Sequence, residues 1–452
     1  MSQPRLLRQL GLFSATAIVV SNMIGTGIFT QTGLLVGNLG SAPMVVSIWF
    51  LGAGLALAGA LCYSELAVNF PRSGGEYVYL TEAFGPVWGF LTGWVSFFAG
   101  FSAPIAAAAL AIVEYLGHFS PALGGVKPGT PSGLGLAVAC AVVLGFTLLN
   151  VFGLLRVARI QNVLTTLKVV VILAFIGLGL AIGQGDWSHF AAPAAPVSGS
   201  VVNQILLSLV LVYFGYSGWN AATYVAEEVR EPERTLPRAL LIGTLLVAVL
   251  YAGLNAVFFY AVPVESLKGV VRVGAVSAQA LFGPAVAGLF AGLMAFSLLS
   301  TVNAMTIIGP RVYYAMASHG AFFRVAERVH PRFHTPWIAV LAQGGCACLM
   351  ILFGTFRGLV QYVGFSLWLF TLMAVVGLFR LRRRPGWRQL PAVSFLFPLI
   401  PGIYVAASAW ACVNSVLYQP KESGYGLLTL VAGAALYHWR VTTQRPSAPP
   451  RP

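Results

Sequence analysis

Two stretches of this sequence place glycines beside polar residues within long apolar segments. "SNMIGTGIF" carries glycines on both sides of Thr26, and "FGYSGWN" carries glycines around Tyr216 and Ser217. Inside a helix, glycine costs about 1 kcal/mol relative to alanine, so each pair needs a structural or chemical reason. Both stretches therefore predict a helix that is interrupted within its apolar segment, at residues 25–27 and at residues 215–218.

An interrupted helix exposes backbone groups that can bind a ligand. In the first break, unpaired N–H groups and the positive end of the helix dipole stand at the start of the outer half, which suits a carboxylate. The inner half ends in free carbonyl groups, as does the chain near Tyr213 and Phe214 in the second break, and carbonyl groups suit an ammonium group. We expect the two breaks together to bind the backbone of an amino acid.

Close helix packing and phosphate binding are the alternatives to an amino-acid site at the breaks. Small residues allow membrane helices to pack closely, and for "GTG" alone packing is as well supported as a binding site. Phosphate binding is disfavoured, because no strand or soluble βα turn precedes the glycines. The recurrence of the break five spans later favours a substrate site, since paired interrupted spans are typical of secondary transporters.

The composition predicts an all-α integral membrane protein. Of its 452 residues, 58% are hydrophobic and only 8% are charged, whereas about a quarter of a soluble domain is charged. Twelve apolar stretches are long enough to cross a bilayer, which takes about 20 helical residues. They lie at residues 11–36, 41–68, 86–116, 133–152, 158–183, 203–226, 238–262, 278–316, 336–354, 358–380, 393–416 and 423–440.

The paired breaks divide these spans into two halves. Spans 1–5 occupy residues 11–183 and spans 6–10 occupy residues 203–380, so the second half is inverted because five is odd. Spans 11 and 12 follow at residues 393–440. The remaining segments, 1–10 and 441–452, are an expected cytoplasmic N-terminus and a cytoplasmic tail.

The net charge of +14 indicates membrane orientation and not nucleic-acid binding. Most of the 26 basic residues fall in segments that are inside if the N-terminus is inside, as in the "RLRRR" run at 380–384. The expected outer loops hold only Lys127, Lys268, Arg272, Arg357 and Lys421. This pattern predicts a multi-pass protein of the cytoplasmic membrane with both termini in the cytoplasm and with lipid as its surroundings.

No residue pattern indicates an enzyme, a metal site or a cofactor. The spans contain no Ser/His, paired-Asp or His-rich metal arrangement, and none of the six histidines sits in the middle of a span, which leaves a histidine proton relay unsupported. The five cysteines are scattered over apolar spans and suggest neither a disulfide framework nor a metal site. They are Cys62, Cys140, Cys346, Cys348 and Cys412.

Four motifs resemble the amino acid–polyamine–organocation superfamily and, within it, the L-type amino-acid transporter group. "IGTGIF" is similar to the first-span signature, in which serine usually stands in place of Thr26. "GALCYSELAVNFPRSGGEYVYLTEAFG" resembles the end of the second span and the inner loop that follows. "FGYSGWNAATYVAEEVREPERTLPRAL" resembles the sixth span and its exit, and "GPRVYYAMASHGAFFRVAERVHPRFHTP" is more weakly similar. The resemblance covers nearly the whole chain.

This resemblance implies the leucine-transporter fold, with ten core helices in two inverted repeats and two peripheral helices. It also implies sodium-independent movement of amino acids, usually by exchange. The substrate carboxylate would lie at residues 25–27, and backbone carbonyls around Ile24, Phe214 and Ser217 would hold the ammonium. Phe214 would form an aromatic gate, and the Asn220 side chain would reach the site. The substrate residues that the resemblance implies are Ile24, Gly25, Thr26, Gly27, Phe214, Ser217 and Asn220.

Lys168, within the fifth span, is the most unusual charged residue. A lysine buried in a bilayer is costly and suggests function, although its long stem could reach the inner face. The resemblance implies that its ammonium replaces a bound sodium ion and bridges the first break and a hydroxyl of the eighth span, either Ser300 or Thr301.

Three glutamates and two loops complete the polar features of the sequence. Glu65, Glu227 and Glu228 end spans, and we expect them to cap helices or form ion pairs at the interface. The resemblance implies that "RSGGEY" belongs to an inner gate. Animal members of the group that this chain resembles use a cysteine in the outer loop after the third span to bond a glycoprotein partner. This loop has no cysteine here, so the resemblance implies no disulfide-linked heavy-chain partner.

We therefore expect a transporter of neutral L-amino acids that works by exchange through alternating access. A proton-coupled amino-acid or polyamine symporter would use the same scaffold, although no acidic residue is firmly placed within a span, which argues against cationic substrates. A channel needs a ring of selective groups, which two broken helices in one chain do not provide. A sensor that binds amino acids without moving them stays an open alternative.

Overall fold

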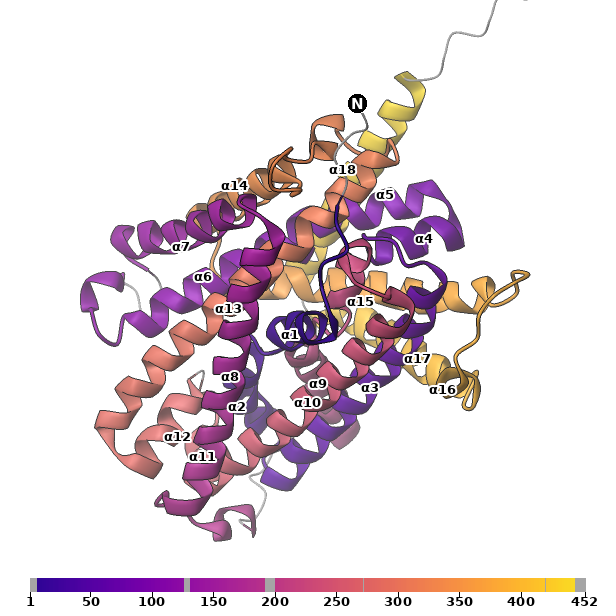
Figure 1. The fold of residues 1–452 in the computed structure, drawn as a ribbon. Coiled ribbons are helices and arrows are strands. Elements are labelled where there is room, and N and C mark those ends of the chain that lie inside the picture. Colours follow the sequence, from indigo (N-terminus) through magenta and orange to yellow (C-terminus); the bar gives the residue numbers. More distant parts are fainter. Residues whose placement is uncertain (1–5, 126–130, 192–199, 271, 419, 444–452) are drawn as a thin grey trace, which may run out of the picture.

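The computed structural model describes residues 6–125, 131–191, 200–270, 272–418 and 420–443, and these ranges form a bundle of helices (Figure 1). Among them, nine helical stretches are long and apolar enough to cross a membrane, and three shorter apolar helices accompany them. The expected terminal segments 1–10 and 441–452 lie partly outside the described residues, and Lys127 lies wholly outside them. The prediction of an all-helical membrane protein is confirmed within these ranges.

The first half of the chain contains the first interrupted helix. Its helices are α1 (Leu12–Met23), α2 (Gly27–Leu39), α3 (Ala42–Asn69), α4 (Glu76–Phe84), α5 (Pro86–Val95), the π-helix η1 (Ser96–Ser102), α6 (Ala103–Leu116), the 3-10 turn η2 (Pro121–Leu123), α7 (Gly133–Val151), α8 (Leu154–Ile182) and the 3-10 helix η3 (Trp187–Ala191).

The second half of the chain contains the second interrupted helix. Its helices are α9 (Val201–Tyr216), the 3-10 helix η4 (Ala221–Glu228), α10 (Pro232–Ala261), α11 (Val264–Leu267), α12 (Val273–Phe282), α13 (Pro284–Ser318), η5 (Arg324–Glu327), α14 (Trp337–Phe353) and α15 (Phe356–Leu381). The last three helices are α16 (Pro391–Ser394), α17 (Leu399–Tyr418) and α18 (Pro420–Thr443). The expected span 278–316 is two helices, because Gly283 has φ +86° and Pro284 starts a new helix.

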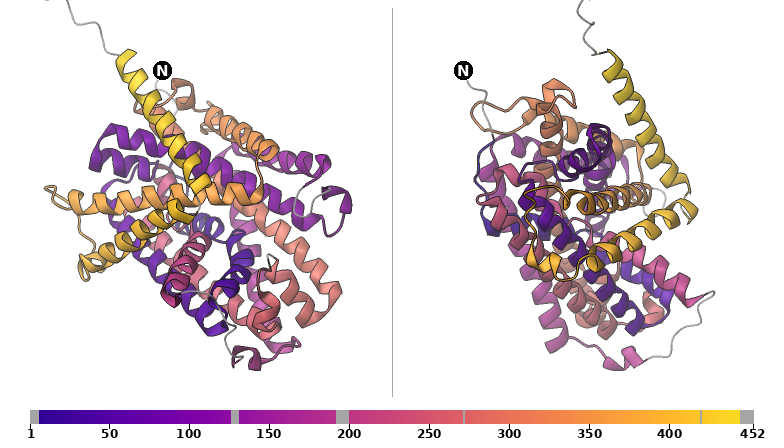
Figure 2. Two further views of the ribbon diagram at one scale, coloured as in Figure 1. Left: turned by 180° about the vertical axis from the view of Figure 1, so that it is seen from behind. Right: turned by 90° about the vertical axis from the view of Figure 1, so that its right-hand side faces the viewer.

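Both interruptions predicted from the glycines are present. α1 ends at Met23 and α2 begins at Gly27, while α9 ends at Tyr216 and η4 begins at Ala221. These broken helices lie inside the bundle: α1 packs against α10 and α8, α2 packs against α9, and α9 also packs against α3. α17 and α18, in yellow, lie on the outside of the bundle (Figure 2).

Glycines bring the two broken helices into backbone contact. A Cβ atom added at Gly27 would lie 2.7 Å from the Cα atom of Gly215, and one added at Gly218 would lie 2.8 Å from the backbone of Asn22. Gly218 also has φ +99°, a conformation that residues with a side chain rarely adopt. The same glycines therefore interrupt the two helices and allow their backbones to pack closely.

Two of the expected interfacial glutamates are fully buried instead. Glu228 accepts hydrogen bonds from Nε and Nη2 of Arg311 on α13, at 2.7 and 3.1 Å, and both side chains are at most 1% exposed. Glu65 is paired with Arg382 at 2.6 Å. Arg311 also donates to the Ile307 carbonyl. Ion pairing of these glutamates was predicted from the sequence. The pairs, however, join helices that are distant in the chain, and they are buried inside the bundle and not at the interface.

Candidate functional site

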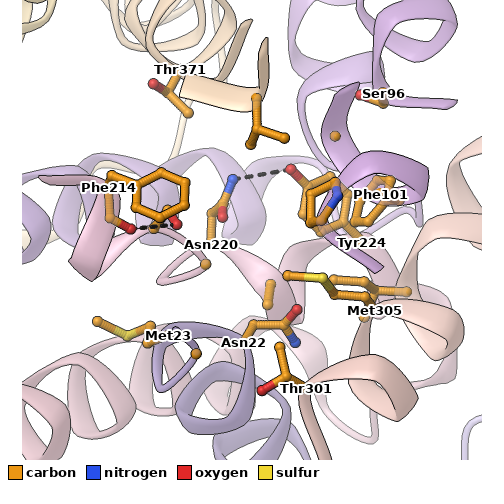
Figure 3. A pocket seen from close by; sticks show the side chains of 18 of the residues that line it. Asn22, Met23, Ser96, Phe101, Phe214, Asn220, Tyr224, Thr301, Met305 and Thr371 are labelled. Atoms are coloured by element: carbon orange, nitrogen blue, oxygen red, sulfur yellow. Dashed lines mark hydrogen bonds between the residues drawn. The ribbon is translucent and has the colours of Figure 1, made fainter. Parts of the chain in front are cut away.

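A cavity of about 110 Å³ lies where the two breaks meet (Figure 3). Its walls come from the α1–α2 break, η1, the α9–η4 break, α13 and α15. The residues that line it include Thr26, Phe101, Phe214, Asn220, Thr301 and Thr371. Of the predicted substrate residues, Gly25, Thr26, Gly27, Phe214, Ser217 and Asn220 line this cavity, whereas Ile24 does not.

The start of α2 presents backbone donors to the cavity. Residues 25–27 line the cavity directly before and at the first turn of α2. The Gly25 N–H donates to the Met23 carbonyl at 2.9 Å, whereas none of the described backbone hydrogen bonds between segments uses the N–H of Thr26 or Gly27, as expected at the start of a helix. The first turn of α2 carries no acidic side chain that could compete for these donors. A carboxylate at this position would accept their hydrogen bonds and lie at the positive end of the helix dipole.

Most carbonyl groups freed by the breaks already accept hydrogen bonds from the chain itself. The Ile24 carbonyl accepts from Lys168 and Thr301, and the Phe214 carbonyl accepts from the N–H and hydroxyl of Ser217 at 3.1 and 2.8 Å. The resemblance implied that carbonyls around Ile24, Phe214 and Ser217 hold the ammonium of the substrate. In the structure, the carbonyls of Ile24 and Phe214 are engaged by side chains, because a freed carbonyl inside the bundle needs a donor.

Lys168 is completely buried and ties the first break to α13. Its Nζ atom donates to the carbonyls of Ile24 and Ser21 at 2.7 and 3.4 Å and lies 3.0 Å from the Thr301 hydroxyl. The side chain is 1% exposed, so it does not reach the inner face. Ser300 does not contact the ammonium; its hydroxyl accepts from Ser21 at 2.9 Å and donates to the Ser297 carbonyl.

A tyrosine joins the two breaks to each other. The Tyr251 hydroxyl, on α10, lies 2.7 Å from the Met23 carbonyl and 2.9 Å from the Gly215 carbonyl. Tyr251 is fully buried. Its role could not be predicted from the sequence, because a tyrosine in an apolar span is usually a packing residue.

The Asn220 side chain is held by a buried polar cluster that the sequence did not indicate either. Its Nδ2 atom donates to Glu76 Oε1 at 2.5 Å. It also donates to the Tyr224 hydroxyl at 3.1 Å (Figure 3). The Tyr63 hydroxyl donates to the same Glu76 oxygen at 2.8 Å. Glu76 is the glutamate of "RSGGEY", and two glycines with positive φ, Gly74 and Gly75, bring it to the cavity.

The π-helix η1 shapes the wall opposite the breaks. Ser96, Gly100 and Phe101 of this segment line the cavity. π-helical turns are rare and are frequent at functional sites, because the extra residue per turn widens the helix and redirects side chains. Apolar periodicity does not reveal such a turn, so the sequence could not have predicted it.

We expect alanine substitutions at Gly27 and Gly25 to have different effects, because an added Cβ meets the backbone of Gly215 at the first position and only the side chain of Thr301 at the second. Gly27→Ala places a methyl group 2.7 Å from the Gly215 Cα atom, and such overpacking should destabilise the protein by about 1–3 kcal/mol. Gly25→Ala meets only Thr301, at 3.9 Å, so it should leave the melting temperature nearly unchanged and weaken amino-acid binding. Melting curves and binding titrations of the purified variants measure both effects.

The matched control for these variants is Gly37→Ala on α2, where an added Cβ meets no atom within 4 Å. This change should alter neither the melting temperature nor the binding. A Gly27→Ala protein with the stability of the unmodified protein would contradict the backbone contact.

The apolar helices and the central cavity define a multi-pass α-helical membrane protein with a small-molecule site between two interrupted helices. The chain belongs to the amino acid permease family, whose model matches residues 10–436. The predicted relationship to this superfamily is confirmed.

Three relatives show how far the similarity extends. The chain is 29% identical to the serine/threonine exchanger SteT of Bacillus subtilis, over 96% of this chain and 97% of that protein. It is 30% identical to the human Asc-type amino acid transporter 1, over 96% of this chain and 82% of that protein. It is 31% identical to the mouse b(0,+)-type amino acid transporter 1, with 96% and 88% covered.

Proposed function

We propose that this protein is a secondary transporter that moves neutral L-amino acids by exchange, independently of sodium. The observation that carries the proposal is the meeting of both interrupted helices at one cavity, with the start of α2 directed at it. The relatives support it, since one is named an exchanger and two are named amino acid transporters. A proton-coupled symporter on the same scaffold is the alternative outcome of the experiment.

The proposal includes an arrangement of the chain in the membrane. The protein would have the leucine-transporter fold with twelve spans, in which residues 11–183 and 203–380 are inverted repeats and residues 393–440 are peripheral. It would lie in the cytoplasmic membrane with both termini in the cytoplasm and without a disulfide-linked heavy chain. The position of the broken helices in the first and sixth segments and the small number of basic residues in the expected outer loops support this arrangement.

In this proposal, the predicted site residues that line the cavity have distinct roles, as does Lys168. The backbone of residues 25–27 binds the substrate carboxylate, Ser217 and Asn220 line the site beside the substrate, and Phe214 covers it. The ammonium of Lys168 takes the place of a cation between α1, α8 and α13. Because this charge belongs to the chain, no dissolved cation has to bind before the substrate.

Counterflow in proteoliposomes tests the function. Vesicles loaded with an unlabelled neutral amino acid should take up the radiolabelled amino acid faster than empty vesicles, and replacing sodium by choline should not alter the rate. Uptake that needs a pH gradient and no internal amino acid would favour the symporter. Binding without uptake would identify a sensor.

Phe214→Ala should slow exchange about tenfold or more while substrate affinity changes by less than about threefold, because closing of the site needs the ring and recognition of the backbone does not. Phe214 is partly buried, and its ring faces the cavity (Figure 3). Exchange rates and binding titrations provide the comparison. Phe353→Ala, at an 87% exposed position, is the control, and an equal loss of affinity and rate in Phe214→Ala would contradict a gate.

A further inference from the structure

Glu76 is a buried acid at the edge of the cavity whose role is not explained by packing. It is 3% exposed and lines the cavity together with Asn220. Its carboxyl group receives hydrogen bonds from Tyr63 and Asn220, and the Tyr224 hydroxyl accepts from the same Asn220 amide. The described groups that act on it include no basic side chain. A buried carboxyl group without a cation is costly, so these donors are what holds it.

The donors determine which way the Asn220 amide faces. An ionised carboxylate only accepts hydrogen bonds, so the amide nitrogen and not the amide oxygen must face Glu76. Both protons of this nitrogen are used, one by Glu76 and one by Tyr224. Among the described hydrogen bonds, none uses the Asn220 amide oxygen, and the residue lines the cavity between Phe214 and Tyr224 (Figure 3).

We propose that Glu76 is a positioning residue that holds the Asn220 amide oxygen toward the cavity, where it accepts a hydrogen bond from the side-chain hydroxyl of the substrate. The substrates favoured by this arrangement are small neutral amino acids that carry a hydroxyl donor, as serine and threonine do. This inference rests on the proposed transport of neutral amino acids and adds the side-chain class to it.

The charge of Glu76 determines whether the arrangement holds. Helix α4 lies between the spans, and burial raises the pKa of Glu76 above its ordinary value, while hydrogen bonds from Tyr224, Tyr63 and Asn220 oppose the shift. As the pH falls through this raised pKa, the carboxyl group gains a proton that it can donate, so the amide oxygen is no longer excluded from facing it. The preference for hydroxylated substrates should therefore be present at high pH and decline as the pH falls.

The other titratable groups around Glu76 would not give the substrate preference the same pH dependence. They are the phenols of Tyr63 on α3, Tyr79 on α4, Tyr213 on α9 and Tyr224 on η4. Ordinary phenols titrate near pH 10, far above the range of the experiment. Helix α5, which packs against α4, has no titratable side chain, and Arg380 at the end of α15 is exposed.

Two substrate pairs test the inference. Threonine and valine have nearly the same shape, as do serine and 2-aminobutyrate, but only the first of each pair has a hydroxyl donor. One hydrogen bond should make the apparent KM of threonine about three- to tenfold lower than that of valine at pH 8. Glu76→Gln should reduce this ratio to below about twofold and remove its pH dependence, because an amide can present either face to Asn220.

Asn220→Ala supplies a second variant in case Glu76→Gln does not fold, and it should abolish the preference because the acceptor is absent. Glu82→Gln is the matched control on the same helix; Glu82 pairs with Arg72 and Arg384 away from the cavity, so this variant should keep both the preference and its pH dependence. An unmodified protein that exchanges both amino acids without preference, or a Glu76→Gln variant that keeps the preference, would overturn the inference. Absence of all amino-acid exchange would instead refute the proposed function.

Discussion

Lys168→Met should reduce amino-acid exchange at least tenfold in proteoliposomes. The substitution removes the only charged donor to the Ser21 and Ile24 carbonyls among the described residues and leaves them with the Thr301 hydroxyl. A buried polar group that loses its partner costs about 1–3 kcal/mol, and 1.4 kcal/mol corresponds to a factor of ten. Because the ammonium joins α8 to the first break and to α13, its loss also uncouples the substrate site from its supporting helices.

The control for this variant is Lys421→Met, which makes the same change at an exposed position. Thr301→Ser keeps the hydroxyl beside the ammonium and should retain most of the exchange, while Thr301→Val should lose part of it. Unaltered exchange in Lys168→Met, or a strict sodium requirement in the unmodified protein, would show that Lys168 does not replace a cation.

Arg311→Leu should lower the free energy of unfolding by about 3–5 kcal/mol, because it leaves the fully buried Glu228 carboxylate without its partner. The Arg311→Leu/Glu228→Leu double variant should recover a large part of this loss, since a buried ion pair can often be replaced by apolar residues of similar volume. Chemical unfolding in detergent, followed by circular dichroism, measures the unmodified protein, the double variant and both single variants, Arg311→Leu and Glu228→Leu, and the four values give the coupling energy.

The exposed pair between Arg234 and Glu231 is the control for the buried pair. Its atoms are 3.7 Å apart and its side chains are 78% and 75% exposed. Arg234→Leu should therefore change the stability by less than about 1 kcal/mol. A similar loss in Arg234→Leu and Arg311→Leu would mean that burial does not set the strength of the Glu228 pair.

The features that sequence could predict are those that a short segment determines by itself. Glycines in an apolar run are costly for a helix, so both breaks were visible at residues 25–27 and 215–218. Lys168 stood out because a charge within a span is expensive. The helices follow the apolar runs, with two divisions that the runs do not show. One is at Gly283, where the backbone has a positive φ, and the other lies within the expected span 393–416, between α16 and α17.

The features that sequence could not predict depend on partners far apart in the chain. Glu76 and Asn220 are separated by 144 residues, and Glu228 and Arg311 by 83. Ser300 and Thr301 are adjacent on α13, yet only the rotation of that helix decides which hydroxyl faces Lys168. For the same reason, the carbonyls of Ile24 and Phe214 could be recognised as freed groups but not as groups that the chain itself occupies.

Carbonyl groups of the two interrupted helices compete for the hydrogen bond of the Tyr251 hydroxyl. A phenol has a single proton to donate, but its oxygen lies within hydrogen-bond distance of both the Met23 and the Gly215 carbonyls. Strengthening the bond to one break weakens the bond to the other, even when no substrate is bound. A small shift of either helix therefore turns the hydrogen bond of the Tyr251 hydroxyl from one carbonyl to the other, which costs less than breaking a hydrogen bond outright.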